Sequence, residues 1–224
     1  MNVVYCCDAK WYQYAKVSAE SVLKHNKANV YFVTDSAERD ERFHYVPLPD
    51  MSEIQKGKGL NFTEYTFIRL YLADLLPMEK VIYLDADTLC VGSLAELYAK
   101  EPECVMGVAE NKFSGGYINT GVMLLNLREY GNHKHEMIQA VNTHSYSFPD
   151  QDAINAVCKV ENIENKWNYC VNVHVTGECE NPSIIHYIWQ KPWNGMCEKA
   201  DLWYAEANIE FKEPIRMKET VIFN

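Results

Sequence analysis

The feature that most constrains this chain is an apolar run that ends in two carboxylates. Residues 81–84 read Val-Ile-Tyr-Leu, and Asp85-Ala86-Asp87 follows at once. A short, continuous apolar run predicts a strand that is buried on both faces of a parallel sheet. Two carboxylates one residue apart on an extended chain point to the same side, so both can face one divalent cation. We therefore predict a strand over Lys80–Leu84 with a metal site at its carboxyl end.

The rest of the chain alternates short apolar runs with helix-like segments. Further strands are expected at Val3–Cys7, Val30–Thr34, Cys104–Ala109, Gly121–Leu127 and Ile184–Tyr187, with Tyr45–Leu48 as an edge strand because it contains Pro47. Helices are expected at Gln13–His25, Thr63–Leu75, His133–His144, Gln151–Cys158 and Glu198–Asn208, and an irregular loop over 50–62. This alternation predicts an α/β fold whose mixed, mainly parallel, Rossmann-like sheet is flanked by helices. Ligands of such sheets bind beyond the carboxyl ends of the strands.

Charge and hydropathy limit the partners. The chain has 21 basic and 31 acidic residues, a net charge of −10, which argues against a broad basic surface for nucleic acid. No apolar run approaches the ~20 residues of a membrane span, although peripheral contact with a membrane stays open. The first residues lack a basic segment and are interpreted as a buried strand rather than a signal peptide.

The cysteines indicate a reducing compartment. Eight are present, without a Cys-x-x-Cys pair, and several lie in apolar runs typical of a core. Free, buried thiols are therefore expected rather than disulfides or a structural zinc site. The corresponding localisation is cytoplasmic.

Six segments, in order along the chain, resemble glycosyltransferase family 8, which contains glycogenin and bacterial lipopolysaccharide galactosyl- and glucosyltransferases. The hallmark is residues 81–87, and the others are residues 3–8 (VVYCCD), 67–70 (FIRL), 117–127 (YINTGVMLLNL), 149–155 (PDQDAIN) and 184–193, where IIHY precedes KPW. The resemblance covers about residues 3–194. It implies a GT-A fold in one catalytic domain over 1–197, and we expect 198–224 to pack on it as a C-terminal appendage.

The resemblance also implies a ligand set. Asp85, Asp87 and His186 are expected to hold the metal, and an imidazole beside carboxylates favours Mn²⁺, with Mg²⁺ as the alternative. The implied donor is a UDP-sugar, with Asp8 hydrogen-bonded to uracil and Trp11 stacked on it. The implied donor-binding residues are Asp8, Trp11, Arg69, Asp85, Ala86, Asn119, Thr120, Gly121, Asp150, Gln151 and Lys191, the last as a phosphate clamp.

Three of these residues are expected to be catalytic: Arg69, Asp150 and Gln151. Asp150 has a second interpretation as the cap of a helix that begins at Gln151. The family retains the donor's anomeric configuration, and the family position nearest the reacting carbon is Gln151, whose amide is a poor nucleophile. We therefore expect same-face attack within an ion pair rather than double displacement.

The closing segment departs from the family pattern. The family has a glycine between its final His and Lys-Pro-Trp, and spaces them one residue further apart. Here Trp189 stands near the glycine's place, which puts the loop shape and the reach of Lys191 in question.

The resemblance implies a retaining, metal-dependent glycosyltransferase that moves a hexose, glucose or galactose, from a UDP-sugar to a glycan acceptor. Two alternatives stay open, a UDP-sugar hydrolase on the same fold and a catalytically degenerate nucleotide-sugar-binding module. Trp189 is the sequence feature that supports the second alternative. The acceptor and the oligomeric state are not predicted.

Overall fold

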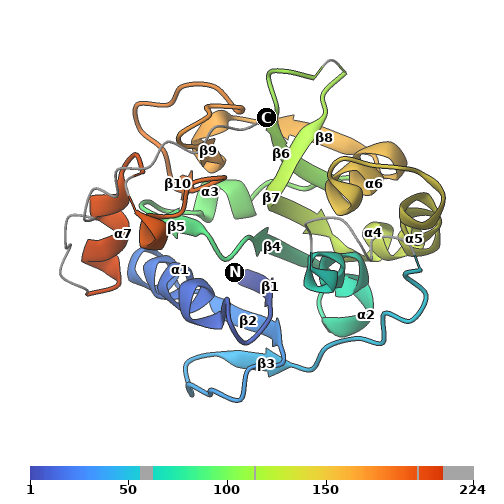
Figure 1. Cartoon of the computed structure of the whole chain (residues 1–224), viewed down its shortest axis with the longest axis horizontal. Coiled ribbons are helices and arrows are strands. Elements are labelled where there is room, and N and C mark those ends of the chain that lie inside the picture. The colour runs from blue at the N-terminus through green and yellow to red at the C-terminus, as the bar shows by residue number, and fades with distance from the viewer. Residues whose placement is uncertain (56–62, 114, 196, 209–224) are drawn as a thin grey trace, which may run out of the picture.

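A computed structural model describes residues 1–55, 63–113, 115–195 and 197–208. Within these residues the chain forms a seven-stranded sheet with helices on both faces, and a separate three-stranded sheet (Figure 1). The strands are β1 (Asn2–Cys7), β2 (Asn29–Thr34), β3 (His44–Val46), β4 (Lys80–Leu84), β5 (Thr88–Cys90), β6 (Val105–Ala109), β7 (Ile118–Asn126), β8 (Val160–Ile163), β9 (Tyr169–Cys170) and β10 (Ile184–His186).

Helices occupy most of the connections. The α-helices are α1 (Tyr12–His25), α2 (Leu72–Leu75), α3 (Ala95–Tyr98), α4 (Leu127–Asn132), α5 (Lys134–Thr143), α6 (Pro149–Val157) and α7 (Ala200–Glu206). Three 3₁₀ helices are η1 (Glu64–Tyr71), η2 (Asn165–Trp167) and η3 (Pro192–Asn194). The predicted α/β fold with alternating strands and helices is confirmed.

The large sheet has the order β3-β2-β1-β4-β7-β6-β8. Its ladders β2–β3, β1–β2, β1–β4 and β6–β8 are parallel, whereas β4–β7 and β6–β7 are antiparallel, so the predicted mixed, mainly parallel sheet is confirmed. The chain runs from β1 outward to β2 and β3, then returns to β4 on the other side of β1. This reversal makes the carboxyl ends of β1 and β4 the place where a ligand crevice is expected.

Both faces of the sheet are covered. Val4, Val81 and Tyr83 face one apolar cluster that includes residues of η1, α5 and α6, while Val3 and Ile82 face a second cluster that includes residues of α1 and α3. Successive residues of a strand point to opposite faces, so a strand buried on both faces must be apolar throughout. This explains why the Val-Ile-Tyr-Leu run predicted β4 correctly, with the bounds Lys80–Leu84.

The small sheet has the order β5-β10-β9 and attaches to the end of β4. Strand β5 begins directly after Asp87, and the backbone N–H of Tyr187 donates to the carbonyl oxygen of Asp87 at 2.9 Å. His186 is paired with Thr88 on one side and with Cys170 on the other. The strand predicted at Ile184–Tyr187 is therefore present, and its neighbours β5 and β9 were not predicted.

Two local predictions differ from the structure. The helix predicted over Thr63–Leu75 is mostly the 3₁₀ helix η1, with α-helix limited to α2. Residues 67–71 of η1 are all buried, so contacts on every side override the local α-helical preference.

Helix α6 begins at Pro149 with Phe148 at its N-cap position, so Asp150 lies inside the first turn and the interpretation of Asp150 as a helix cap is wrong.

Other expectations can be compared in the same way. All eight cysteines lie in the described residues and are free, as predicted, with five of them buried. No described helix is long and apolar enough to cross a membrane. Of the predicted 50–62 loop, residues 56–62 lie outside the described residues. Helix α7 contacts α1 and η3, while 209–224 are not described, so the 1–197 and 198–224 division stays a prediction.

Candidate functional site

Two cavities, each of about 290 Å³, meet at the carboxyl end of β4, and one of them also reaches the carboxyl end of β1. The Gln151 cavity is lined by residues of β7, α6 and the segments around Glu110 and His186. The Asp8 cavity is lined by the ends of β1 and β4 and by η1. The two cavities share Thr66, Arg69, Asp85 and Asp87, so the Asp-Ala-Asp segment stands at their junction.

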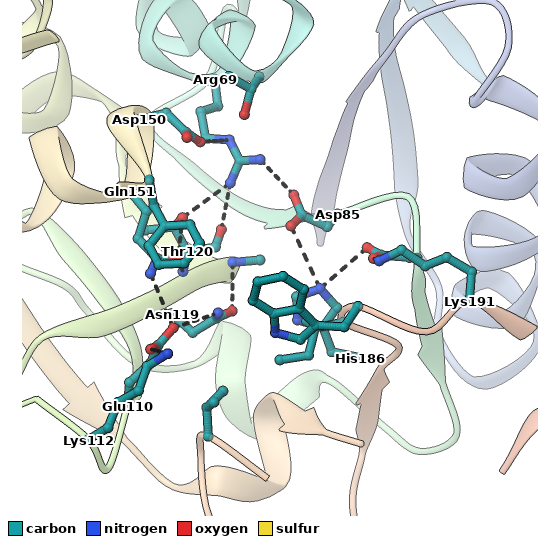
Figure 2. A pocket seen from close by; sticks show the side chains of 17 residues that line it. Arg69, Asp85, Glu110, Lys112, Asn119, Thr120, Asp150, Gln151, His186 and Lys191 are labelled. Atoms are coloured by element: carbon teal, nitrogen blue, oxygen red, sulfur yellow. Dashed lines mark hydrogen bonds and ion pairs between the residues drawn. The ribbon is translucent and has the colours of Figure 1, made fainter. Parts of the chain in front are cut away.

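All three side chains that were predicted as metal ligands come together at this junction. One ligand atom each from Asp85, Asp87 and His186 lies within 4.8 Å of the other two. His186 Nε2 is 3.7 Å from Asp85 Oδ2 (Figure 2). The same nitrogen is 3.3 Å from Asp87 Oδ1. Two carboxylates and an imidazole at this spacing fit one divalent cation with room for further oxygen ligands.

The orientation of the His186 ring follows from a chain of hydrogen bonds. The N–H of Gly121 donates to Asn119 Oδ1 at 3.0 Å, and Asn168 Nδ2 donates to the same oxygen at 2.8 Å. Asn168 Oδ1 therefore faces His186 Nδ1 at 2.9 Å and accepts a hydrogen bond from the Nδ1–H group. Nε2 is thus the nitrogen directed at the two carboxylates, an orientation typical of metal-ligating histidines.

Charge at the junction is balanced by neighbours. Burial alone would lower the pKa of His186, but the adjacent Asp87 carboxylate overrides it and raises that pKa to about 10. Burial opposes ionisation of Asp87, yet Lys191 and His186 hold its pKa well below the usual range. Lys191 Nζ donates to Asp87 Oδ2 and, at 2.8 Å, to the carbonyl oxygen of Tyr187. Asp87 is therefore ionised at neutral pH.

The position of Gly121 has no room for a side chain, because His186 and Asp85 lie against its backbone. The residue lies in β7 beside Asp85, whose N–H donates to the Gly121 carbonyl oxygen at 2.8 Å. A Cβ atom at this position would be 2.1 Å from His186 Cε1 and 2.9 Å from Asp85 Oδ2. Any side chain would therefore displace two of the three candidate ligands.

Arg69 connects the two carboxylates that flank the junction. Its Nη2 donates to Asp85 Oδ1 at 2.8 Å, and its Nε lies 3.1 Å from Asp150 Oδ2 (Figure 2). Its Nη1 donates to the backbone and hydroxyl oxygens of Thr120 at 3.1 and 3.2 Å. The Tyr83 hydroxyl also donates to Asp85 Oδ1 at 2.7 Å. Asp85 Oδ1 therefore accepts from both Arg69 and Tyr83, whereas Oδ2 faces His186.

The amide of Gln151 is held from four directions. Its Oε1 accepts from the N–H and hydroxyl of Thr120 at 3.0 and 3.3 Å, while its Nε2 donates to Glu110 and to the Tyr117 hydroxyl at 3.1 and 3.0 Å. Neighbouring Asp150 is buried, and burial raises its pKa, with Arg69 acting in the opposite direction. The segments around Asn119, Asp150 and Gln151 thus line the Gln151 cavity together.

The Asp8 cavity gathers four of the residues that were expected to bind the donor, including the two assigned to uracil. Asp8, Trp11, Ala86 and the shared Asp85 line it. Asp8 Oδ1 accepts from the Trp11 N–H at 2.7 Å, and the Trp11 side chain is 37% exposed. Lys191 lines the Gln151 cavity instead, with its Nζ 6.0 Å from the Trp11 ring.

Glu110 is a site residue that the sequence reasoning missed. It is buried, lines the Gln151 cavity, and its Oε1 accepts from both Asn119 and Gln151. Its Oε2 lies 3.6 Å from the Lys112 ammonium group. The available signal was position, because Glu110 directly follows β6 as Asp8 follows β1 and Asp85 follows β4.

A sequence model of glycosyl transferase family 8 matches residues 2–197. The chain belongs to glycosyltransferase family 8. The predicted family is thereby confirmed, and with it the prediction of a glycosyltransferase at the level of the family.

Named relatives of this family 8 chain include lipopolysaccharide enzymes. Lipopolysaccharide 1,2-glucosyltransferase of Escherichia coli is 24% identical over 290 residues, covering 97% of this chain and 83% of the relative. Lipopolysaccharide 1,3-galactosyltransferase of Salmonella typhimurium is 27% identical over 245 residues, covering 86% and 73%. Glycosyltransferase GlyF of Streptococcus pneumoniae is 21% identical over 252 residues, which cover 95% of this chain but 62% of GlyF. The chain thus spans less than two thirds of the length of GlyF.

Solved structures agree on the fold. The galactosyltransferase LgtC, in complex with donor and acceptor sugar analogs, superposes with a TM-score of 0.78 at 18% identity, covering 96% of this chain and 98% of LgtC. Apo GlyE of Streptococcus pneumoniae superposes with a TM-score of 0.73 at 20% identity, covering 93% and 60%. These similarities confirm the predicted GT-A-type fold.

Proposed function

We propose that this chain is a retaining, Mn²⁺-dependent glycosyltransferase that moves a hexose from a UDP-sugar to a glycan acceptor. The observation that carries the proposal is the cluster of Asp85, Asp87 and His186, whose two carboxylates line both cavities. A nucleotide sugar also has two parts joined at a centre, because its nucleoside and its sugar lie on either side of a diphosphate. A cation at the junction would therefore meet the diphosphate.

The side chains fit such a cation. His186 directs Nε2 at the two carboxylates, and Gly121 leaves the space that a Cβ would fill. Oxygen ligands with one imidazole favour Mn²⁺, with Mg²⁺ as the alternative. When bound, the cation would stabilise negative charge on the departing diphosphate. We assign Lys191 the role of a second positive charge for the same diphosphate, because its ammonium group lies beside Asp87 and so beside the proposed metal site.

The opposite parts of the donor are assigned to the two cavities. Asp8 and Trp11 are proposed to bind uracil in the Asp8 cavity, with Ala86 and Asp85 against the ribose. Arg69, Asn119, Thr120 and Asp150 are proposed to bind the sugar in the Gln151 cavity.

Retention is proposed to proceed by same-face attack within an ion pair. A covalent route needs a nucleophile at the reacting carbon. The amide of Gln151 is neutral, and both of its polar atoms already make hydrogen bonds. Asp150 is held against the Arg69 guanidinium. We assign Gln151 to orienting the sugar and positioning the acceptor, with the leaving diphosphate taking the acceptor's proton.

The relatives support a hexose and a glycan acceptor. Two of them are named as lipopolysaccharide glucosyl- and galactosyltransferases. An LgtC variant with an active-site glutamine changed to glutamate has also been solved, so a structural relative carries glutamine in its active site. Glucose or galactose is therefore the proposed sugar.

A donor screen tests the proposal. The purified chain is incubated with Mn²⁺ and UDP-glucose, UDP-galactose, UDP-N-acetylglucosamine or GDP-mannose, and released nucleoside diphosphate is measured with and without an acceptor glycan panel. We expect release from a UDP-hexose that Mn²⁺ and an acceptor both stimulate. Full release without any acceptor would instead support a hydrolase. Metal-dependent UDP binding with no transfer across the panel would support a degenerate binding module.

A further inference from the structure

Trp189 has an unusual environment for a tryptophan. Its side chain is 67% exposed, more than any other large apolar side chain in the described residues. Its φ is +64°, in the left-handed region that glycine adopts without strain and that other residues seldom occupy. Neither burial nor backbone preference therefore explains a tryptophan at this position.

The strained backbone is fixed by its neighbours. The N–H of Gln190 donates to the carbonyl oxygen of Ile188 at 2.8 Å, which closes a γ-turn with Trp189 at its centre. Asn172 Nδ2 reaches the carbonyl oxygens of both Ile188 and Gln190, at 3.3 and 3.4 Å. The turn lies between His186 and Lys191 in the chain. Strain that is held in place next to a candidate active site points to a functional role.

The surroundings of Trp189 suggest which substrate it meets. Trp189 lines the Gln151 cavity, together with Ile188 and Val175, and is not part of the Asp8 cavity. The same cavity contains the Glu110 carboxylate and the Lys112 ammonium group, 3.6 Å apart. An aromatic side chain thus borders the same cavity as polar groups that can bind hydroxyls.

We propose that Trp189 is the stacking platform for a pyranose ring of the acceptor glycan, and so a determinant of acceptor specificity. This inference rests on the proposed function. One face of a pyranose carries mainly C–H groups, which pack on an indole ring, while its edge carries hydroxyls that need hydrogen bonds. An indole that is already exposed and fixed on a short turn binds such a face with little further ordering.

The test separates acceptor binding from nucleotide binding. Wild type, Trp189→Gly, Trp189→Ala and Trp189→Phe are compared on a glycan array with UDP and Mn²⁺ present, and UDP affinity in Mn²⁺ is measured by calorimetry without glycan. We expect at least a tenfold loss of glycan affinity in the Gly and Ala variants and about threefold or less in the Phe variant. UDP affinity should stay within twofold. Because glycine suits a positive φ, Trp189→Gly should keep the melting temperature of wild type.

Leu202→Ala is the matched control, because Leu202 is 39% exposed and lines neither cavity. It should leave both affinities unchanged. Glycan binding that survives in Trp189→Gly overturns the proposal, as does a loss that falls on UDP rather than on glycan. A wild-type chain that binds UDP but no glycan also overturns it. A wild-type chain that fails to bind UDP in Mn²⁺ refutes the proposed function itself.

Discussion

Gly121 and Gln151 are the two residues whose surroundings make the sharpest predictions. Gly121 lies against two candidate ligands, and Gln151 connects Thr120 to Glu110 through hydrogen bonds. Gly121 matters because it has no side chain, and Gln151 because hydrogen bonds hold both its amide oxygen and its amide nitrogen. Substitution at each position therefore tests a different part of the site, metal binding at Gly121 and chemistry at Gln151.

Gly121→Ala should weaken Mn²⁺-dependent UDP binding at least tenfold, because the new Cβ would overlap His186 and crowd Asp85. Calorimetry of UDP with and without Mn²⁺ measures the effect. Gly92→Ala is a suitable control, since its Cβ would lie 3.3 Å from Ser183 Oγ and Gly92 lines neither cavity. Equal metal-dependent binding in Gly121→Ala and wild type would contradict the geometry of the site.

Gln151→Ala should lower kcat about 10–100-fold while a residual, metal-dependent transfer persists, because Gln151 is proposed to orient the sugar rather than to bond it. Initial rates over a range of donor concentrations provide kcat and KM. Mass spectrometry of wild type incubated with donor should detect no sugar on Gln151. A trapped Gln151 adduct, together with complete loss of activity in the variant, would require double displacement instead.

At the scale of elements, the small sheet and α7 hold the third candidate ligand in place. His186 is in β10, whose neighbours β5 and β9 have three and two residues. Trp203 of α7 is 2% exposed and packs on Tyr187 and Trp193, with ring centroids 5.6 and 5.0 Å apart. Tyr187, which directly follows His186, and Trp193, two residues after Lys191, thus both pack on α7.

A chain that ends at Cys197 should therefore be less stable than the full chain and should bind Mn²⁺ and UDP more weakly. Removing Trp203 from its contacts costs about 3–5 kcal/mol by analogy with large-to-small core substitutions. Thermal and urea unfolding of the full chain, the truncated chain and Trp203→Ala measure the change. A truncated chain with unchanged stability would support the simpler division at residue 197, with α7 as a dispensable addition.

Sequence patterns predicted the elements that have long, regular signals. Strand β4 was clear because a strand buried on both faces must be apolar throughout, and α1 because its small and apolar residues repeat at helical spacing. Strands β5 and β9, of three and two residues, were missed because their residues carry no such signal. The 3₁₀ form of η1 depends on contacts that local sequence does not contain.

The site followed a similar rule. Asp8 and Asp85 could be found because they directly follow buried strands, and Asp87 because it pairs with Asp85 across one residue. The same rule applied to β6 would have found Glu110. His186 was placed by family resemblance, since its own strand is too short to identify its neighbours. Asn168, which orients the His186 ring, lies in a segment without any pattern that points to the site.

At the scale of the whole molecule, the fold brings chain segments far apart in sequence to one junction. The carboxyl ends of β1 and β4, strand β7, helix α6 and the small sheet all contribute to the two cavities. The central claim is that a cation held by Asp85, Asp87 and His186 couples a nucleotide in one cavity to a sugar in the other.

The most direct test is Mn²⁺-dependent sugar transfer by wild type and Asp87→Ala, measured as diphosphate release from the active UDP-sugar in the presence of acceptor. Circular dichroism and thermal unfolding establish that the variant is folded, and wild type with chelator provides the metal-free reference. We predict that folded Asp87→Ala has no more activity than the chelated wild type. Full metal-dependent transfer by this variant would contradict the account.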